Sequence, residues 1–132
     1  MQRLMVLLKR KPGMTQEAFR RHYEDVHAAL GTQFFGGLMV AFRRYYPTEL
    51  KPFPSDWGSL ASTAPDPGAF DAITVYSFRD EAARREYLRR MNDPAIASVL
   101  MRDEERFLDR AACRVGFCDG EEGDGIRNDR EP

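Results

Sequence analysis

The stretch that decides the fold is residues 70–78, FDAITVYSF. Successive side chains of a β strand point to opposite faces of its sheet, so the residues fall into two alternating sets. One set is Ala72, Thr74, Tyr76 and Phe78, and the other is Ile73, Val75 and Ser77. Both sets are largely apolar, which predicts a strand over residues 72–78 with both faces largely buried.

Two strands and a helix are predicted before this strand. A β-favouring run, Leu4 to Lys9, ends at a Pro-Gly turn, and a second strand is expected from Leu38 to Tyr46. Between them Thr15 can cap a helix that we expect to close at Gly31. Its apolar stripe at helical spacing consists of Phe19, Tyr23, Val26 and Leu30.

Two helices and a last strand are predicted after it. Asp80 is expected to cap one helix, Asp93-Pro94 to begin the next, and residues 113–118 to form the strand. The order strand, helix, strand, strand, helix, helix, strand predicts an α+β fold of the ferredoxin-like, split βαβ type. In this fold helices cover one face of a four-stranded antiparallel sheet.

The other face of that sheet predicts the assembly. A monomer would leave several hundred Å² of apolar surface in water, more than soluble monomers usually tolerate. We therefore expect a homodimer in which two sheets pack face to face around a two-fold axis and form a dimeric α+β barrel.

Domain boundaries follow from length and composition. The chain has 132 residues, 42 % of them hydrophobic, which suits one domain over residues 1–118. Residues 119–132 hold six acids and two arginines, so we expect an acidic, poorly ordered tail. Residues 47–70 contain five prolines without periodicity; because long structureless loops are commonly functional, we expect a lid.

Charge and cysteine content restrict partners and location. Twenty basic and 21 acidic residues give a net charge of −1, which offers no summed field to nucleic acid or an anionic membrane. The amino terminus has an apolar run too short for a signal peptide or a membrane span. Cys113 and Cys118 are expected on opposite faces and therefore unpaired, in keeping with a cytoplasmic protein.

Several blocks of the chain carry a family resemblance. Residues 9–30, KRKPGMTQEAFRRHYEDVHAAL, resemble the opening of the EthD-like family of dimeric α+β barrel proteins. The blocks FDAITVY (70–76), NDP (92–94) and DEERFLD (103–109) resemble the same family, in particular its fungal aromatic-polyketide decarboxylases. The resemblance implies cofactor-free chemistry on aromatic or polyketide-like compounds. The decarboxylase-like members carry a histidine where this chain has Glu104.

His27 is the leading candidate for catalysis. It corresponds to a histidine that the family places at the end of this helix, and an imidazole exchanges protons near neutral pH. The alternative is a histidine that bonds a loop carbonyl and holds the helix end. His22 stands five residues earlier, about 140° around an α-helix, so we expect no metal pair but a surface contact with Asp25.

Further candidates surround His27 in the expected pocket. A phenol from Tyr76 could polarise a carbonyl, and Asp103 or Glu104, if buried, could act as a base; core tyrosines and solvated helix-end acids are the alternatives. One of Arg43 and Arg44 could point inward and clamp an anion. The expected substrate-binding set is Tyr23, Arg43, Tyr45, Trp57 and Phe107, with Tyr46 as the alternative to Tyr45.

The sequence supports three functional hypotheses. The first is a cofactor-independent enzyme that decarboxylates, cyclises or otherwise acts as a lyase on a small aromatic or polyketide-like compound. The second is a non-catalytic accessory protein that binds such a compound, and the third is a cofactor-free monooxygenase-like oxidoreductase. No nucleotide-binding fingerprint or metal-ligand spacing is present, so we expect neither cofactor nor metal.

Overall fold

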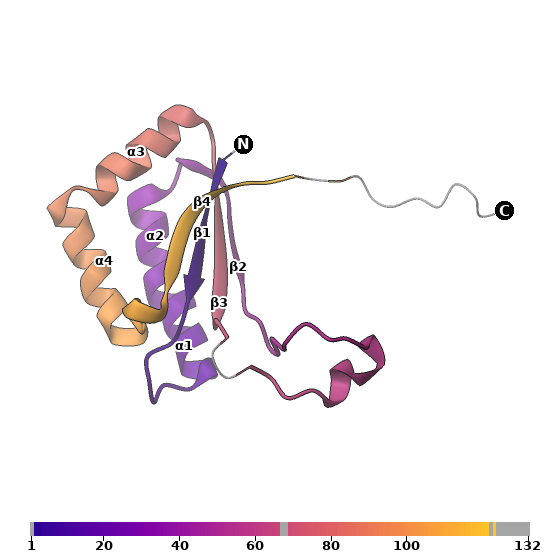
Figure 1. Cartoon of the computed structure of the whole chain (residues 1–132). Coiled ribbons are helices and arrows are strands. Elements are labelled where there is room, and N and C mark those ends of the chain that lie inside the picture. The colour runs from indigo at the N-terminus through magenta and orange to yellow at the C-terminus, as the bar shows by residue number, and fades with distance from the viewer. Residues whose placement is uncertain (1, 67–68, 122, 124–132) are drawn as a thin grey trace.

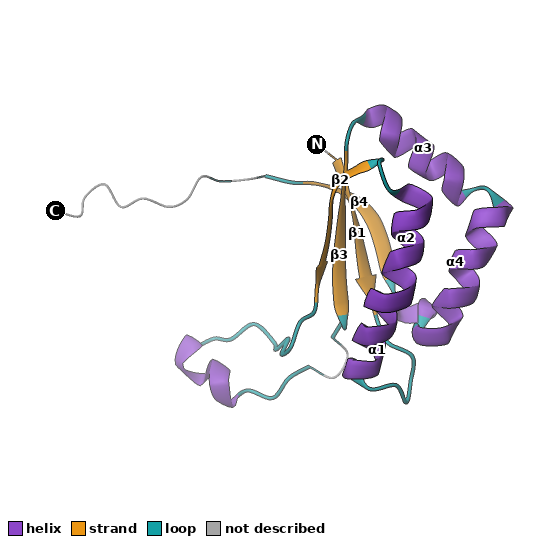
Figure 2. Cartoon of the chain, turned by 180° about the vertical axis from the view of Figure 1, so that it is seen from behind, coloured by secondary structure: helices purple, strands orange, loops and turns teal. Residues whose placement is uncertain are grey.

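The computed structural model describes residues 2–66, 69–121 and 123, and its strands form one antiparallel sheet. The sheet order is β2-β3-β1-β4, with bounds β1 (Gln2–Leu8), β2 (Met39–Tyr45), β3 (Ala72–Phe78) and β4 (Arg114–Asp119). On β1, Val6 lies opposite Thr74 of β3 and Val115 of β4. The main helices lie together on one face of this sheet (Figures 1 and 2). The predicted α+β, ferredoxin-like architecture is confirmed.

The helical segment after β1 is an α-helix interrupted by one π-helical turn. An α-helix, α1 (Gln16–His22), leads into a π-helical turn, η1 (Tyr23–His27), and then into α2 (Ala28–Phe35). Thr15 caps the start as predicted, since its Oγ1 accepts the Ala18 N–H at 3.1 Å. In the π turn the Ala28 N–H donates to the Tyr23 carbonyl, five residues back, which widens the turn by one residue.

Two expectations for this helix were wrong. It does not close at Gly31, which lies inside α2; the left-handed backbone occurs instead at Gly37, where φ is +87°. Val26, expected on the buried stripe, is 38 % exposed. The wider π turn shifts the register of the residues beyond Tyr23, so an α-helical projection misplaces them.

The remaining helices begin where their caps predict. Asp80 Oδ1 accepts the Ala83 N–H at 2.8 Å and begins α3 (Glu81–Met91). Asp93 Oδ1 accepts the Ala95 N–H at 3.0 Å and begins α4 (Pro94–Phe107), with Pro94 in the first turn. A short 3-10 helix, η3 (Arg110–Ala112), includes Cys113 in its last hydrogen bond, so β4 begins one residue later than predicted.

The core between helices and sheet consists of two clusters. One contains Leu4, Phe35, Leu38, Phe78, Ala83, Tyr87 and Leu100, and the other contains Leu8, Phe19, Tyr23, Ala28, Ala72, Phe107 and Leu108. The opposite face of the sheet carries half-buried Ile73 and Val75, together with Met5 and the 53 % exposed Tyr45. This face is uncovered and partly apolar, as predicted.

The connection between β2 and β3 extends away from the domain. It contains a 3-10 helix, η2 (Trp57–Ser62), and lies on the side of the sheet opposite to the helices (Figures 1 and 2). Most of the predicted acidic tail lies outside the described residues. Within the described part of the chain, no helix combines the length and apolarity needed to cross a bilayer.

Candidate functional site

A cavity of about 590 Å³ lies between the helices and the sheet. Members of both core clusters border it, and its aromatic and aliphatic walls include Phe35, Phe42, Tyr87 and Leu100. Polar side chains also face it, among them Tyr23, His27, Tyr76 and Glu104, with Arg110 and Arg114 at the η3–β4 side. A mostly apolar cavity of this size with few convergent polar groups is typical of a small-molecule site.

His27 is held by a buried carboxylate. Its Nδ1 lies 2.9 Å from Oδ2 of Asp103, a side chain only 2 % exposed. An ionised carboxylate only accepts, so we assign the His27 proton to Nδ1, which leaves Nε2 as the free basic nitrogen. That nitrogen lies 3.9 Å from Glu104 Oε2. The arrangement orients the imidazole and leaves one ring nitrogen available for proton exchange, as an acid–base residue requires.

His22 contacts the same carboxylate, which the sequence did not predict. Its Nε2 lies 2.9 Å from Asp103 Oδ1, so the expected surface contact with Asp25 was wrong. Residues five apart diverge on an α-helix but align where i→i+5 bonding widens the turn. The π turn between the two histidines therefore brings both rings to Asp103. Across residues 2–66, 69–121 and 123, no cluster of three or more ligating side chains suits a metal ion.

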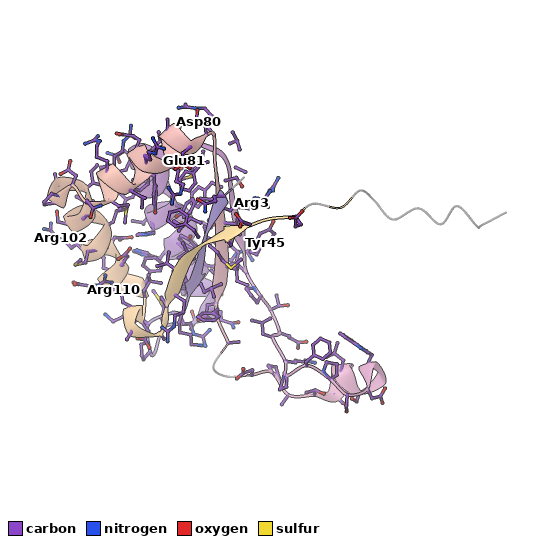
Figure 3. The ribbon with its side chains drawn as sticks, turned by 45° about the horizontal axis from the view of Figure 1, so that its top comes forward. Arg3, Tyr45, Asp80, Glu81, Arg102 and Arg110 are labelled. Atoms are coloured by element: carbon purple, nitrogen blue, oxygen red, sulfur yellow. The ribbon has the colours of Figure 1, made fainter. Side chains whose placement is uncertain are left out.

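Glu104 is the second carboxylate of the site. Burial raises the pKa of its carboxyl, while the nearby His27 and Arg110 partly oppose that rise. Arg110 Nε lies 3.3 Å from Glu104 Oε1, and Arg110 projects from the turn between α4 and β4 (Figure 3). Because the pKa is raised, Glu104 holds a proton more readily than a solvated glutamate and can share one with His27.

Two phenols line the sheet side of the cavity. The hydroxyls of Tyr23 and Thr74 lie 2.5 Å apart, and burial raises the pKa of Tyr23 to about 12. Tyr76 stacks on Phe42 with ring centroids 4.8 Å apart, and burial raises its pKa well above the ordinary value. Both phenols therefore stay protonated at neutral pH and can donate a hydrogen bond to a ligand oxygen.

Five of the predicted site residues lie outside the cavity lining: Asp103, which holds His27 from behind, and Phe107, Arg43, Tyr45 and Trp57. Phe107 is fully buried behind it and packs on both imidazoles, with ring centroids 4.7 Å from His22 and 5.1 Å from His27. Arg43 and Tyr45 lie on the uncovered face, since they pair with Val75 and Ile73 of β3. Trp57 packs against Phe53 in the β2–β3 loop, ring centroids 5.4 Å apart.

Arg44, not Arg43, is the strand arginine on the helix side. It binds Glu24 in a bidentate pair, with Nε–Oε2 at 2.5 Å and Nη2–Oε1 at 3.0 Å. Tyr46 donates to the same carboxylate. None of the described residues of the 47–70 loop lines the cavity, so the loop does not roof it within one protomer.

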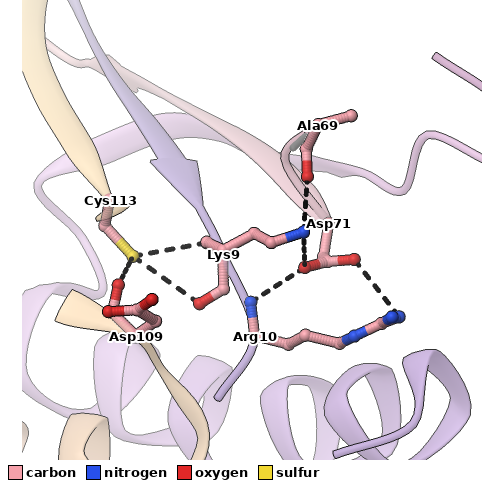
Figure 4. A network of polar contacts seen from close by, with 6 residues as sticks. All are labelled: Lys9, Arg10, Ala69, Asp71, Asp109 and Cys113. Carbon is pink, nitrogen blue, oxygen red and sulfur yellow. Dashed lines mark hydrogen bonds and ion pairs between the residues drawn. The ribbon is translucent and has the colours of Figure 1, made fainter. Parts of the chain in front are cut away.

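Polar contacts link the end of β1 to Asp71, the residue before β3, and to Cys113, which lines the cavity (Figure 4). Asp71 accepts the Arg10 backbone N–H at 2.8 Å and pairs with the Lys9 ammonium at 3.7 Å. The Lys9 N–H donates to Cys113 Sγ at 3.3 Å. Burial raises the pKa of the Cys113 thiol, so it remains protonated and packs as a neutral wall group.

These features define a class of protein, a ferredoxin-like α+β domain with a mostly apolar cavity and an imidazole–carboxylate pair at its wall. The model of the EthD domain matches residues 11–111, so the chain belongs to the EthD family. The predicted family membership is confirmed.

Solved structures share this fold. An EthD family protein of Bacillus halodurans is 14 % identical, with a TM-score of 0.56 over 92 % of this chain and 100 % of that one. An EthD-like protein of Ralstonia eutropha is 15 % identical, with a TM-score of 0.57 over 89 % of each chain. A dimeric protein of unknown function and ferredoxin-like fold from Bacteroides fragilis is 8 % identical, with a TM-score of 0.50 over 90 % of this chain and 95 % of that one. A comparison with curated proteins finds no match.

Proposed function

We propose that this EthD-domain protein is a cofactor-independent enzyme acting on a small aromatic or polyketide-like compound. One observation carries the proposal: His27 faces a mostly apolar cavity with one ring nitrogen, while the other bonds the buried Asp103. A histidine that only secured the helix would need no buried carboxylate behind it, because burying that charge is unfavourable unless it is paired; His27 also lies inside the helical segment, which continues to Phe35, and not at its end.

The residues suit a reaction driven by proton transfer. His27 Nε2 takes a proton from the substrate or returns one to it, and Asp103 stabilises the imidazolium that forms in between. Tyr23 and Tyr76 can donate to a carbonyl or phenol oxygen on which negative charge develops. Decarboxylation, cyclisation and related lyase steps all need this combination of a proton carrier and an oxyanion donor.

Two other functions remain as alternatives. A non-catalytic accessory protein would bind the same class of compound, but the polar wall of the cavity favours proton transfer over simple storage. A cofactor-free oxidoreductase would use electrons of an electron-rich phenol and consume oxygen. Glu104 stands where the decarboxylase-like relatives carry a histidine, so the family resemblance alone does not choose among the lyase reactions.

The uncovered face of the sheet and the free thiols bear on the assembly and location of the proposed enzyme. We infer a homodimer formed through the uncovered face of the sheet, where Met5, Ile73 and Val75 would be removed from water. We also place the protein in the cytoplasm, in keeping with the free thiols of Cys113 and Cys118. In such a dimer the 47–70 loop could act as a lid only on the partner, since it extends away from its own cavity.

Turnover by purified protein tests the proposal. Hydroxylated aromatic and polyketide carboxylic acids are incubated with the protein, and mass spectrometry scores loss of carbon dioxide, loss of water or gain of oxygen. We expect His27→Gln to lower any turnover by at least about 100-fold, the usual contribution of a general acid–base residue. Glu105→Gln, at an exposed position of α4, is the control and should match the unmodified protein. Full turnover in His27→Gln would refute the role of His27, and binding without turnover would favour the accessory protein.

A further inference from the structure

The described contacts show a second imidazole behind the site that the proposed reaction does not use. Asp103 lies between two histidines, with Oδ1 2.9 Å from His22 Nε2 and Oδ2 2.9 Å from His27 Nδ1. His22 does not line the cavity. We propose that His22 is a positioning residue for His27, acting through Asp103, and that the two imidazoles titrate as one coupled unit on their shared carboxylate.

The shared carboxylate restricts the geometry of His27. Each oxygen of Asp103 serves a different ring, so the carboxylate cannot rotate without lengthening both bonds at once. Without His22, Oδ1 would keep only the longer ion pair with the exposed Arg106, at 3.5 Å, which restrains the carboxylate less than a 2.9 Å hydrogen bond. His22 therefore fixes the plane in which Asp103 accepts the His27 proton, and with it the direction of His27 Nε2 into the cavity.

The surrounding backbone and packing hold both imidazoles in place against Asp103. The π turn Tyr23–His27 begins directly after His22 and ends at His27, and turns of this rare kind are frequent at functional sites. Phe107 packs against both rings, so neither imidazole can change its tilt freely. Without the π turn, an α-helix would direct His22 about 140° away from His27 and no common partner could be reached.

The charges around the pair determine its titration. Arg106 Nη1 lies 3.5 Å from the same Asp103 oxygen that His22 contacts. Glu104 faces His27 Nε2 at 3.9 Å and is itself paired with Arg110. When one imidazole gains a proton, its positive charge balances the negative charge of Asp103. The other imidazole must then gain its proton beside a carboxylate whose charge is already balanced. Protonation of one histidine therefore opposes protonation of the other.

Histidine NMR tests the coupling directly, because the chain contains only two histidines. The full-length protein, labelled with 15N in histidine, is titrated alongside His22→Gln and His27→Gln, each of which leaves one imidazole. We expect the two midpoints of the unmodified protein to sum to about one pH unit less than the two single-variant midpoints, a tenfold mutual effect. If the two midpoints of the unmodified protein sum to the same value as the two single-variant midpoints, the imidazoles titrate independently and the coupling is overturned.

A second variant keeps the test decisive if the histidine substitutions disturb folding. Asp103→Asn retains both imidazoles and the size of the side chain but removes the shared negative charge. We expect both midpoints to move to lower pH, because the charge that favours each imidazolium is gone. Unchanged midpoints would show that Asp103 is not their common partner and would overturn the proposal.

The positioning role rests on the proposed function, and turnover on an established substrate measures it. His22→Ala should lower kcat about tenfold with little change in KM, and His22→Gln, whose amide can still donate to Asp103, should restore most of the rate. Equal rates for His22→Ala and the unmodified protein would overturn the role. If no substrate is found, the proposed function fails while the titrations still decide the coupling.

Discussion

Replacing Asp103 tests how much the histidine–carboxylate unit contributes to stability. Asp103 is 2 % exposed and accepts two imidazole N–H groups at 2.9 Å each. A hydrogen bond to a charged group is worth about 1.5–3 kcal/mol and a neutral one about 0.5–1.5 kcal/mol. Asp103→Asn makes both bonds neutral and should lower the free energy of unfolding by about 2 kcal/mol. Asp103→Leu leaves two half-buried imidazole N–H donors without their acceptor and should lower it by about 4 kcal/mol.

Urea unfolding at one protein concentration measures these differences, since dimerisation would make stability depend on concentration. With a slope of about 1.5 kcal/mol per molar urea, Asp103→Asn should lower the midpoint by about 1.3 M. Glu105→Gln is the control, because it removes an acid from an exposed position on the same helix and should change stability by at most about 0.5 kcal/mol. If Asp103→Asn unfolds at the unmodified midpoint, or Asp103→Leu is the more stable of the two, the assigned hydrogen bonding is wrong.

Three further predictions address charge and assembly. The Arg44 hydrogen bonds lower the pKa of Glu24 to about 2, so this carboxylate stabilises the fold above pH 4.5 and the benefit is lost as the pH falls toward 2. Glu24→Gln should therefore cost at most about 1 kcal/mol in urea unfolding at pH 7, given its partial exposure, and nothing near pH 2. Burial raises the pKa of Glu104, so the stability it contributes falls as the pH rises through that pKa; Glu104→Gln should melt at a higher temperature than the unmodified protein at pH 8, with a smaller difference at pH 5. Val75→Glu places a charge on the uncovered face and should give a monomer by sedimentation, and a dimer of unchanged affinity would exclude that face as the interface.

The fold was predictable because its signals are local. Asp80 and Asp93 cap α3 and α4 where the sequence places them, and the alternation over residues 72–78 coincides with β3. A cap needs only the next three residues and a strand pattern only its neighbours, so neither depends on the rest of the chain. Helix length was less predictable, since Gly31 suits a stop but packing continues α2 to Phe35.

The composition of the site was predictable only in part. His27, Tyr76, Glu104 and Tyr23 were expected in the pocket, and all four line the cavity. The alternation of Arg43 and Arg44 shows that they point to opposite faces, but the pairing of Arg44 with Thr74 decides which one faces the helices. Trp57 could not be placed, because the direction of a long loop is not encoded in its local pattern.

Sequence by itself determined the order of strands and helices, their caps and the family, because those depend on neighbouring residues and on recognisable motifs. Only the tertiary structure decided that His22 belongs to the site. A spacing of five residues separates two side chains on an α-helix and brings them together on a π turn. Their common partner, Asp103 of α4, lies 81 positions from His22 in the chain. The pairing of His22 and His27 on Asp103 is thus a property of packing, not of spacing.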